Sequence, residues 1–493
     1  MVNRPGSGTS SDIPFPKEIG HVKEQQLKGW RRKWIAIGTG VGLVLAGLAG
    51  GAVYQVTRPA PPPPAGPPCA SCMSPAPANA AMGRVLDAIN KENSAVRAAA
   101  GRPWVSVVLL TPLTPAPGSD VTVARMVDEL RGAYEAQLAL EGSAGIGVQL
   151  LVDNEGTSLE ANEGPAVRQL LSVAVADHVV AVLGPGVSNA ATGAAATVLD
   201  TRGMPMFGFV TSADRFSAPP GPGQYPDLVQ VIPNVTAQVG QLARELGPLR
   251  STVLVYDSST SDYYTGDLSA DFGHAFAASL TGEPQPYTPD EDPKSQFRVT
   301  AEEVCSPSVT PVVLYAGRQV VLSAFISQLM AYGGCAGKDV TIVTGSDGDG
   351  VAPSSTADRP GEGRVSVVYS DVVDLGKLTA PFQSRYRTDL AKIDPGAAGL
   401  GDTWMVTAYD ALSAAGTAIQ QAYTDPEAGI PTRASVLTWV DRLNGVLKIP
   451  GATGAFSLDN HGRLVGFTVP VYVDTQGGRA PFTAALAAQL GLR

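Results

Sequence analysis

The sequence has few of the residues on which several protein classes depend. Its 493 residues include four cysteines and four histidines, and aromatic residues make up 6% of the chain. A secreted scaffold built on disulfides needs far more cysteine, so that class is excluded. No two histidines stand at the spacing with which a helix holds a metal ion, so we expect solvated or packed side chains and no metal site. The histidines are His21, His178, His274 and His461.

Basic residues are also scarce relative to acidic ones. Lys and Arg number 35 against 45 Asp and Glu, which gives a formal net charge of −10. Proteins that bind nucleic acid carry basic patches on their surface. We therefore expect no nucleic-acid partner.

The motifs of common enzymes are missing as well. Gly184-Pro185-Gly186 is followed by Asn189 where a dinucleotide-binding G-x-G-x-x-G needs its last glycine. The chain has no G-x-S-x-G elbow and no Walker motif. The acidic segment 346–350 resembles the start of a calcium loop, but the downstream Glu is missing, so a turn is expected. The sequence predicts neither an enzyme nor a bound cofactor.

One long apolar run is present, at residues 34–56. Its core carries no charge and is long enough to span a bilayer as a helix. A basic cluster at 28–33 precedes it, and Arg58 alone follows it closely. This asymmetry predicts a single-pass protein of the cell membrane, with a cytoplasmic N-terminus and an extracytoplasmic main domain. A cleaved signal peptide with a long N-terminal region is the alternative.

The apolar run lies between two segments of unusual composition. Residues 1–33 are rich in Gly, Ser, Pro and charge, which predicts a disordered tail. Residues 57–80 are rich in Pro and predict a semi-rigid stalk. Cys69 and Cys72 in this stalk form a C-x-x-C, for which redox chemistry or half a zinc site is possible. Their proline-rich surroundings favour a tethering disulfide. A helical lead-in is expected at 81–101.

From Arg102 onward, strand and helix patterns alternate. Amphipathic helices are expected at 123–140 and 166–176, and the intervening strands are nearly continuous apolar runs, as in buried parallel sheets. Eight βα units exceed one ordinary domain, which favours two doubly wound lobes. A TIM barrel is the alternative, but the irregular spacing after Gly345 argues against it. The strand candidates are 104–110, 147–152, 179–184, 205–210, 252–257, 311–316, 340–345 and 364–370.

The other two cysteines, Cys305 and Cys335, lie within this α/β region. A bridge between them would close a loop of about 30 residues. In an oxidising compartment it would stabilise the fold by about 3–4 kcal/mol on a loop-entropy estimate. We expect this disulfide.

Four segments together resemble the type I periplasmic binding proteins. The segment 179–216 combines a strand, Gly-Pro, a Ser-Asn helix start and a strand ending in Thr-Ser, and 253–272 is a strand followed by a helix that starts on an aromatic residue. The segment 403–419 has a Tyr-Asp-Ala helix core, and 451–473 has a Gly-x-Phe-x-x-Asp-x-x-Gly hairpin. The chain from 104 to 474 looks closest to the leucine/isoleucine/valine-binding branch and to extracellular ligand-binding receptors.

The resemblance implies two lobes joined by three crossovers, with a ligand in the cleft between them. We place the crossovers near Pro233, Asp371 and Pro450. Both Cys305 and Cys335 would then belong to lobe 2. The expected bounds are 102–233 plus 371–449 for lobe 1, 234–370 plus 450–475 for lobe 2, and 476–493 for a C-terminal tail.

Residues just after the strands are candidates for ligand binding, because ligands of doubly wound sheets bind beyond the carboxyl ends of the strands. Ser188 and Asn189 follow the third strand, where they can cap a helix or bind a carboxylate. Thr211 and Ser212 follow the fourth strand, where the family places similar residues in its pocket. The sequence leaves helix capping open for all four.

Two more candidates come from the second half of the cleft. Tyr264 matches the family's cleft aromatic, although Thr265 and Asp267 replace the glycines usual beside it. Asp347 follows a strand and would pair with a ligand ammonium. The loop at 111–120 is rich in proline and departs from the family's short loop, so one cleft wall is expected to differ.

Taken together, these features predict an extracytoplasmic solute-binding protein anchored by its own N-terminal helix. It would capture a small ligand by hinge closure and present it to the membrane permease of an ABC-type transporter. An amino acid is the default ligand, with a peptide, a urea-like amide or an aromatic acid as alternatives. The alternative function is a ligand-sensing or scaffold ectodomain that signals through a separate membrane partner. A member that has lost ligand binding is also possible, given the altered first loop.

Overall fold

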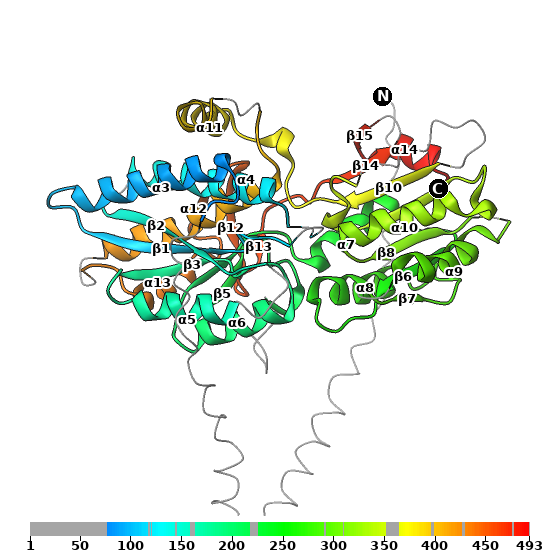
Figure 1. The fold of residues 1–493 in the computed structure, drawn as a ribbon, viewed down its shortest axis with the longest axis horizontal. Helices are drawn as coiled ribbons and strands as arrows, with labels where there is room; N and C mark the ends of the chain where they lie inside the picture. Colours follow the sequence, from blue (N-terminus) through cyan, green and yellow to red (C-terminus); the bar gives the residue numbers. More distant parts are fainter. Residues whose placement is uncertain are drawn as a thin grey trace, which may run out of the picture. The chain divides into compact units, whose positions relative to one another are not determined.

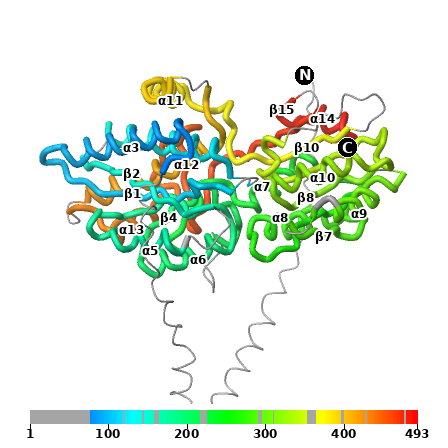
Figure 2. Tube along the Cα trace, in the orientation of Figure 1, coloured from blue at the N-terminus to red at the C-terminus, as the bar shows by residue number. Residues whose placement is uncertain are grey.

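A computed structural model describes most of the chain after residue 75, as two lobes (Figures 1 and 2). The predicted tail, the membrane helix and most of the stalk, with Cys69 and Cys72, lie outside the described residues. Within those residues, no helix is both long and apolar enough to cross a membrane. The described ranges are 76–116, 119, 121–142, 145–157, 163–216, 225–289, 292–308, 310–351, 364–395, 399–425, 429–475 and 478–492.

Lobe 1 is built on a five-stranded sheet whose neighbouring strands all run parallel. Its strands are fully or nearly fully buried, as expected for apolar runs covered on both faces. Successive residues of β1 point to opposite faces, so that Val107 and Leu109 join one core cluster while Val108 and Leu110 join another. In spatial order the strands are β2 (Gly147–Asn154), β1 (Trp104–Thr111), β3 (Val179–Leu183), β4 (Met206–Gly208) and β5 (Leu228–Gln230).

Helices cover both faces of this sheet. The first core cluster packs under α3, α4, α11, α12 and α13, and the second packs under α5 and α6. The bounds are α3 (Ala80–Ala98), α4 (Val123–Glu141), α5 (Glu163–Val173), α6 (Ala190–Asp200), α11 (Ala380–Ile393), α12 (Thr403–Thr424) and α13 (Arg433–Val440).

The predicted lead-in helix is an integral part of lobe 1. The buried side chain of Asn93 in α3 donates to the Leu150 carbonyl at 2.8 Å and accepts from the Leu150 N–H at 2.9 Å. These bonds satisfy the backbone of β2, which stands at the edge of the sheet. The helix therefore closes an edge that would otherwise present unpaired backbone groups.

Lobe 2 is built on a seven-stranded sheet with a mixed direction. Strands β7, β6, β8, β9 and β10 pair in parallel, whereas β14 and β15 are antiparallel to their neighbours. The helices α9 (Pro293–Cys305) and α10 (Gln319–Ala331) cover one face, and α7 (Val235–Leu246), α8 (Tyr263–Ala275) and α14 (Ala484–Gln489) cover the other. The strands are β7 (Gln285–Tyr287), β6 (Thr252–Asp257), β8 (Val312–Ala316), β9 (Val340–Thr344), β10 (Val365–Ser370), β14 (Val471–Thr475) and β15 (Gly478–Pro481).

The two sheets share one strand order, in which the first strand of each lobe lies between the second and the third. This order and the helices on both faces confirm the predicted α/β architecture and exclude a closed barrel. The order reverses between β1 and β3 in lobe 1 and between β6 and β8 in lobe 2. Such reversal points open a crevice at the carboxyl ends of the strands.

The C-terminal part of the chain is divided between the lobes differently from the prediction. A small sheet of β11 (Ile449–Gly451), β12 (Gly454–Leu458) and β13 (Leu464–Val465) follows α13. Its apolar residues belong to the core of lobe 1, and the Gly462 carbonyl accepts from the Gln230 N–H at 2.7 Å.

The third crossover therefore falls between β13 and β14, not near Pro450, because the hairpin buries its apolar side chains in lobe 1. The segment 476–493, expected as a tail, contributes β15 and α14 to lobe 2. The other two crossovers lie between β5 and α7 and between β10 and α11, in the stretches that hold Pro233 and Asp371. Figure 1 shows the result: blue α3 and orange α12 share one lobe, and yellow β10 and red β14 share the other.

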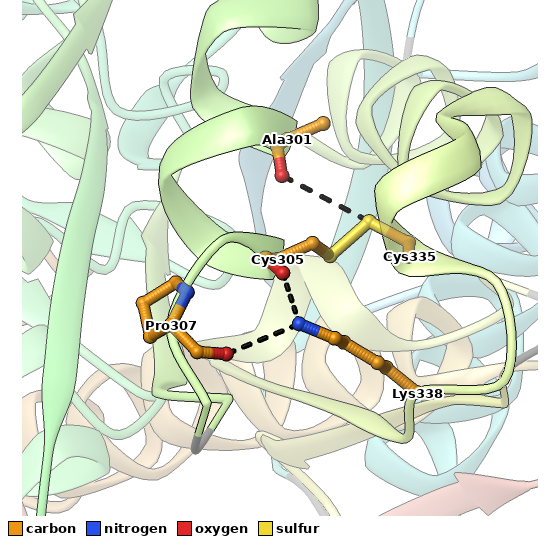
Figure 3. Close-up of a disulfide and its surroundings, with 5 residues drawn as sticks. All are labelled: Ala301, Cys305, Pro307, Cys335 and Lys338. Atoms are coloured by element: carbon orange, nitrogen blue, oxygen red, sulfur yellow. Dashed lines mark hydrogen bonds between the residues drawn. A yellow bond between two sulfur atoms is a disulfide. The ribbon is translucent and has the colours of Figure 1, made fainter.

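A disulfide joins Cys305 and Cys335 in lobe 2, the pair expected from the sequence (Figure 3). Cys305 ends α9, and Cys335 lies in the short 3₁₀ turn η2 (Gly333–Cys335), which follows α10. The Lys338 ammonium donates to the carbonyls of Cys305 and Pro307. The bridge and this lysine tie together two helix ends that are distant in the sequence.

Candidate ligand-binding cleft

A cavity lies where the two lobes face each other, and lobe 1 gives it a largely apolar wall. This wall comes from the loops after β3, β4 and β5, from the segment before α4, and from the start of α12. Most of it is made of branched aliphatic and aromatic side chains, which can bury the apolar part of a small molecule. These residues are Val121, Val187, Phe209, Val210, Ile232 and Trp404.

Lobe 2 and the second crossover supply a charged wall. Arg318 follows β8, Asp347 and Asp349 follow β9, and Asp371 follows β10. Each stands at the carboxyl end of a strand, where parallel sheets place their ligand-binding loops. The cavity therefore has one apolar side and one ionic side.

Arg318 is the most highly connected side chain of the charged wall. Its guanidinium donates to both carboxylate oxygens of Asp262, at 2.6 and 2.9 Å, and to Asp347 at 3.5 Å. It also lies 4.7 Å from the ring centre of Tyr264, which is a cation–π distance. The bidentate pair holds the guanidinium across the point where the strand order of lobe 2 reverses.

A second ionic group joins the charged wall to the sheet edge. Arg479 in β15 donates to Asp349 at 2.7 Å and to Asp371 at 2.6 Å. Asp371 is almost completely buried, and burial together with the Asp349 charge raises its pKa to about 7, although Arg479 acts in the opposite direction. One guanidinium thus serves two carboxylates on the cavity wall.

Lobe 1 contributes a third ionic group at the start of α12. Asp402 caps this helix by accepting from the Trp404 N–H at 2.9 Å, and it pairs with Arg125 at 3.4 Å. Burial raises the pKa of Asp402 to about 6. Arg125 lowers this pKa, while the carboxylates of Asp128 and Asp349 raise it. Because Asp349 belongs to lobe 2, acidic groups act on each other across the cavity.

The lobes also contact each other directly at one side of the cavity. The Ser188 carbonyl of lobe 1 accepts from the N–H groups of Tyr263 and Tyr264, at 3.0 and 3.2 Å. The Tyr263 ring packs against the second core cluster of lobe 1, 6.0 Å from the Phe216 ring, and the Arg215 guanidinium lies 3.7 Å from its centre. The first turn of α8 is therefore docked onto lobe 1.

The candidates predicted in lobe 1 have mostly structural contacts. The Ser188 hydroxyl accepts from the Ala213 N–H at 2.9 Å, and the Asn189 side chain caps α6 by accepting from the Thr192 N–H at 2.8 Å. The buried Thr211 hydroxyl lies 2.9 Å from the Pro185 carbonyl oxygen. The Asn189 bond is the predicted alternative of helix capping, whereas Ser188 and Thr211 hold the backbone of neighbouring loops.

Ser212 is the predicted lobe 1 candidate that lines the cavity. It is 6% exposed, and its hydroxyl has no hydrogen-bond partner among the residues that the structure describes. Because the residue lines the cavity, this hydroxyl is available to a bound molecule.

The candidates predicted in lobe 2 lie together. The buried Tyr264 hydroxyl accepts from the Asp347 N–H at 3.4 Å and lies 3.5 Å from the Ser346 hydroxyl. Burial raises the pKa of Tyr264 well above its usual value, so this phenol stays neutral. Asp347 lines the cavity, but Arg318 already pairs with it. The ring of Tyr264 packs against the Arg318 guanidinium.

Sequence reasoning missed four charged residues and one tryptophan that line the cavity. For three of them a signal was present. Arg318 directly follows the Ala-Gly at the end of a predicted strand, Asp349 lies two residues after Asp347, and Asp371 directly follows the predicted strand 364–370. Trp404 lies in the first turn of a helix that was recognised for its core. No local pattern marks Arg125, which reaches the cavity because of how the lobes are placed.

Comparison with solved structures identifies proteins of similar fold. The leucine-binding protein LivK from Thermotoga maritima MSB8 has a TM-score of 0.54 at 15% identity, with 77% of this chain and 99% of that chain covered. A substrate-binding protein of an ABC transporter from Desulfitobacterium hafniense, solved in complex with Leu, has a TM-score of 0.55 at 15% identity and the same coverage. An ABC-transporter solute-binding protein from Rhodopseudomonas palustris BisB5, in complex with 3,4-dihydroxybenzoic acid, has a TM-score of 0.52 at 13% identity, covering 77% and 98%.

No protein-family profile matches the sequence, and no curated protein matches it significantly. At such low identity the structural likeness establishes the fold alone. The described residues thus have the fold of the type I periplasmic binding proteins, in agreement with the resemblance seen in the sequence.

Proposed function

We propose that this chain is a solute-binding protein that takes a small ligand, an amino acid or a related compound, into the cavity between its lobes. The observation that carries the proposal is the cavity itself. It lies beyond the carboxyl ends of the strands of both lobes, and it sets an apolar wall against an ionic one. A ligand with an apolar body and a polar group would contact both walls at once.

Binding would be coupled to closure of the lobes. A ligand that contacts both walls only when they are close together stabilises the closed arrangement. The three crossovers are the hinge, since they are the only covalent links between the lobes within the described chain. The closed form would then be recognised by the permease of an ABC-type transporter, and no chemical step is required.

For the location of the protein, we propose a single-pass membrane protein with both lobes outside the cytoplasm. The uncharged run at 34–56 and the basic cluster before it support this orientation. The disulfide between Cys305 and Cys335 is in keeping with an oxidising compartment.

A thermal-shift screen of the purified full chain tests the function. At a concentration of about a hundred times its dissociation constant, a ligand stabilises the folded form by about 2.7 kcal/mol. We expect a saturable rise in melting temperature of a few degrees with at least one amino acid, amide or small organic acid.

Two tryptophan variants show whether the cavity is the site. Trp404→Ala removes a ring from the cavity wall and is expected to abolish the shift. Trp439→Ala in α13 is the matched control, since its ring also lies beside a guanidinium, that of Arg442, but is not part of the cavity. A well-folded chain with no shift across a broad panel would contradict solute binding and favour the scaffold alternative.

A further inference from the structure

The ionic groups around the cavity contain more acid than base. The charged residues that line it, together with their ion-pair partners, comprise five aspartates and three arginines. Within this set the aspartates outnumber the arginines by two. The aspartates are 262, 347, 349, 371 and 402, and the arginines are 125, 318 and 479.

The distribution of these pairs shows where the excess lies. Arg318 has its two short bonds to Asp262, outside the cavity lining, and a longer contact with Asp347. Arg479 alone is shared between Asp349 and Asp371. Arg479 therefore leaves one carboxylate charge uncompensated in its group. Both of its partners, Asp349 and Asp371, line the cavity, whereas Asp262 does not.

A second observation, independent of the acids, points to a ligand at the same place. Ser212 is a largely buried residue that lines the cavity, and its hydroxyl has no hydrogen-bond partner among the described residues. The Ser212 hydroxyl can accept a hydrogen bond from an ammonium. The Trp404 ring stands on the same lobe 1 wall, with the Arg125 guanidinium 5.7 Å from its centre, and offers apolar surface to the body of a ligand.

We propose that the ligand is a small organic cation, an ammonium group on an apolar body. Its charge would lie against Asp349 and Asp371, with its body on the lobe 1 wall. This inference rests on the proposed solute-binding function and names the class of its ligand. It differs from the default amino acid, because each arginine around the cavity already pairs with an aspartate and a ligand carboxylate would compete with that partner.

A metal ion is a weaker fit to this charge. Within the described ranges, no group of three or more His, Cys, Asp or Glu side chains is arranged to hold a metal. An ammonium needs only hydrogen-bond acceptors and an apolar surface, and the cavity has both. The apolar wall would have no role in binding a bare ion.

Compounds that share a carbon skeleton and differ in charge provide the test. Leucine, 3-methylbutan-1-amine and 4-methylpentanoate carry the same branched chain with both charges, only the ammonium, or only the carboxylate. Phenylalanine, 2-phenylethylamine and 3-phenylpropanoate repeat the series with a ring. Calorimetric titration of the full chain is expected to show that an amine binds at least about tenfold more tightly than its zwitterion or its acid. Its affinity should fall as salt is added.

Charge variants locate the contact. Asp349→Asn keeps the shape of the side chain and is expected to weaken amine binding about tenfold. Asp339→Asn is the matched control, because Asp339 also pairs with an arginine, Arg364, but lies exposed away from the cavity lining. It should leave the affinity unchanged.

The outcomes separate the two proposals. If a leucine- or benzoate-like acid or zwitterion binds at the cavity and the amines do not, the cation proposal is overturned while solute binding stands. Equal loss of affinity in Asp349→Asn and Asp339→Asn also overturns it. If no compound of a broad panel binds a well-folded chain, the solute-binding function itself fails.

Discussion

The two lobes share a strand order, but they meet the cavity with different chemistry. Lobe 1 presents mainly aliphatic and aromatic side chains, with Arg125 at its margin, whereas lobe 2 and the second crossover present a guanidinium and carboxylates. The equivalent crevices of the two lobes therefore differ in the side chains that they present to the cavity. Apolar contact contributes affinity in proportion to buried area, and paired charges contribute selectivity. The division lets each lobe perform one of these tasks.

The lobes also differ in how they are held together. Lobe 1 relies on close helix packing, since 16 of the 22 residues of α12 are buried and this helix crosses α4 at a glycine. Lobe 2 has a covalent link between α9 and the turn after α10, and it extends its sheet with two antiparallel strands from the C-terminus. Substitutions at these features should therefore change the stability of one lobe and leave that of the other unchanged.

The largest effect is expected from removal of the disulfide. Cys305→Ala combined with Cys335→Ala opens the loop in the unfolded chain and should lower the unfolding free energy of lobe 2 by about 3–4 kcal/mol. Calorimetry should show the lobe 2 transition moving to lower temperature while that of lobe 1 stays in place. Wild-type protein in a reducing agent is the control and should behave alike. An equal shift of both transitions would mean that the lobes unfold as one unit.

The next effect concerns the crossing of α4 and α12 in lobe 1. A Cβ atom added at Gly132 would stand 1.9 Å from the Met405 carbonyl oxygen, so Gly132→Ala must push the helices apart. We expect a loss of about 2–3 kcal/mol in the unfolding free energy of lobe 1, measured by urea denaturation.

Gly273→Ala in α8 of lobe 2 is the matched control for this crossing. A Cβ atom there meets nothing within 4 Å, so the change should stabilise its helix by up to about 1 kcal/mol. A neutral Gly132→Ala would contradict the tight crossing.

A smaller and pH-dependent effect is expected at Glu129, which is completely buried in α4. Burial raises its pKa to about 8, with a smaller opposing effect of Thr111. Between the unfolded pKa, near 4, and the folded one, the native state keeps a proton that the unfolded chain releases. Stability therefore falls as pH rises through this window and levels off above it.

Glu129→Gln removes that dependence. Relative to wild type, it should be nearly neutral at pH 4 and stabilising by on the order of 2 kcal/mol at pH 8, as measured by denaturation at each pH. Glu302→Gln is the control, since Glu302 is exposed on α9 of lobe 2 and should show no such trend. A flat difference for Glu129→Gln would contradict a proton held by the native state.

Much of the secondary structure could be predicted from local patterns. The apolar run at 104–110 became β1, the amphipathic pattern at 123–140 became α4, and the two cysteines in the α/β region are bridged. Such patterns work because burial on both faces of a sheet, or on one face of a helix, imposes a period on neighbouring residues. The hairpin at 449–465 was assigned to the wrong lobe, since its apolar residues would suit either core.

The candidate site was less accessible to sequence reasoning. The rule that ligand-binding residues follow strands selected Ser212 and Asp347, which line the cavity, and the family resemblance selected Tyr264, whose ring lies against Arg318. The same rule selected Asn189 and Thr211, whose side chains hold helix and loop geometry instead. A strand end shows where a side chain emerges, but not what it contacts.

The sequence by itself determined the α/β class, the two-lobed architecture, the cysteine pair and the acidic character of the chain. These follow from composition and from short-range periodicity, which can be read from neighbouring residues along the chain. Only the tertiary structure decided that Arg318 pairs with Asp262, that Arg479 is shared by Asp349 and Asp371, and that lobe 1 faces them with an apolar wall. The reason is physical. These contacts join residues up to about 130 positions apart. Ion pairing depends on the distance between two charges in space, which cannot be read from their separation along the chain.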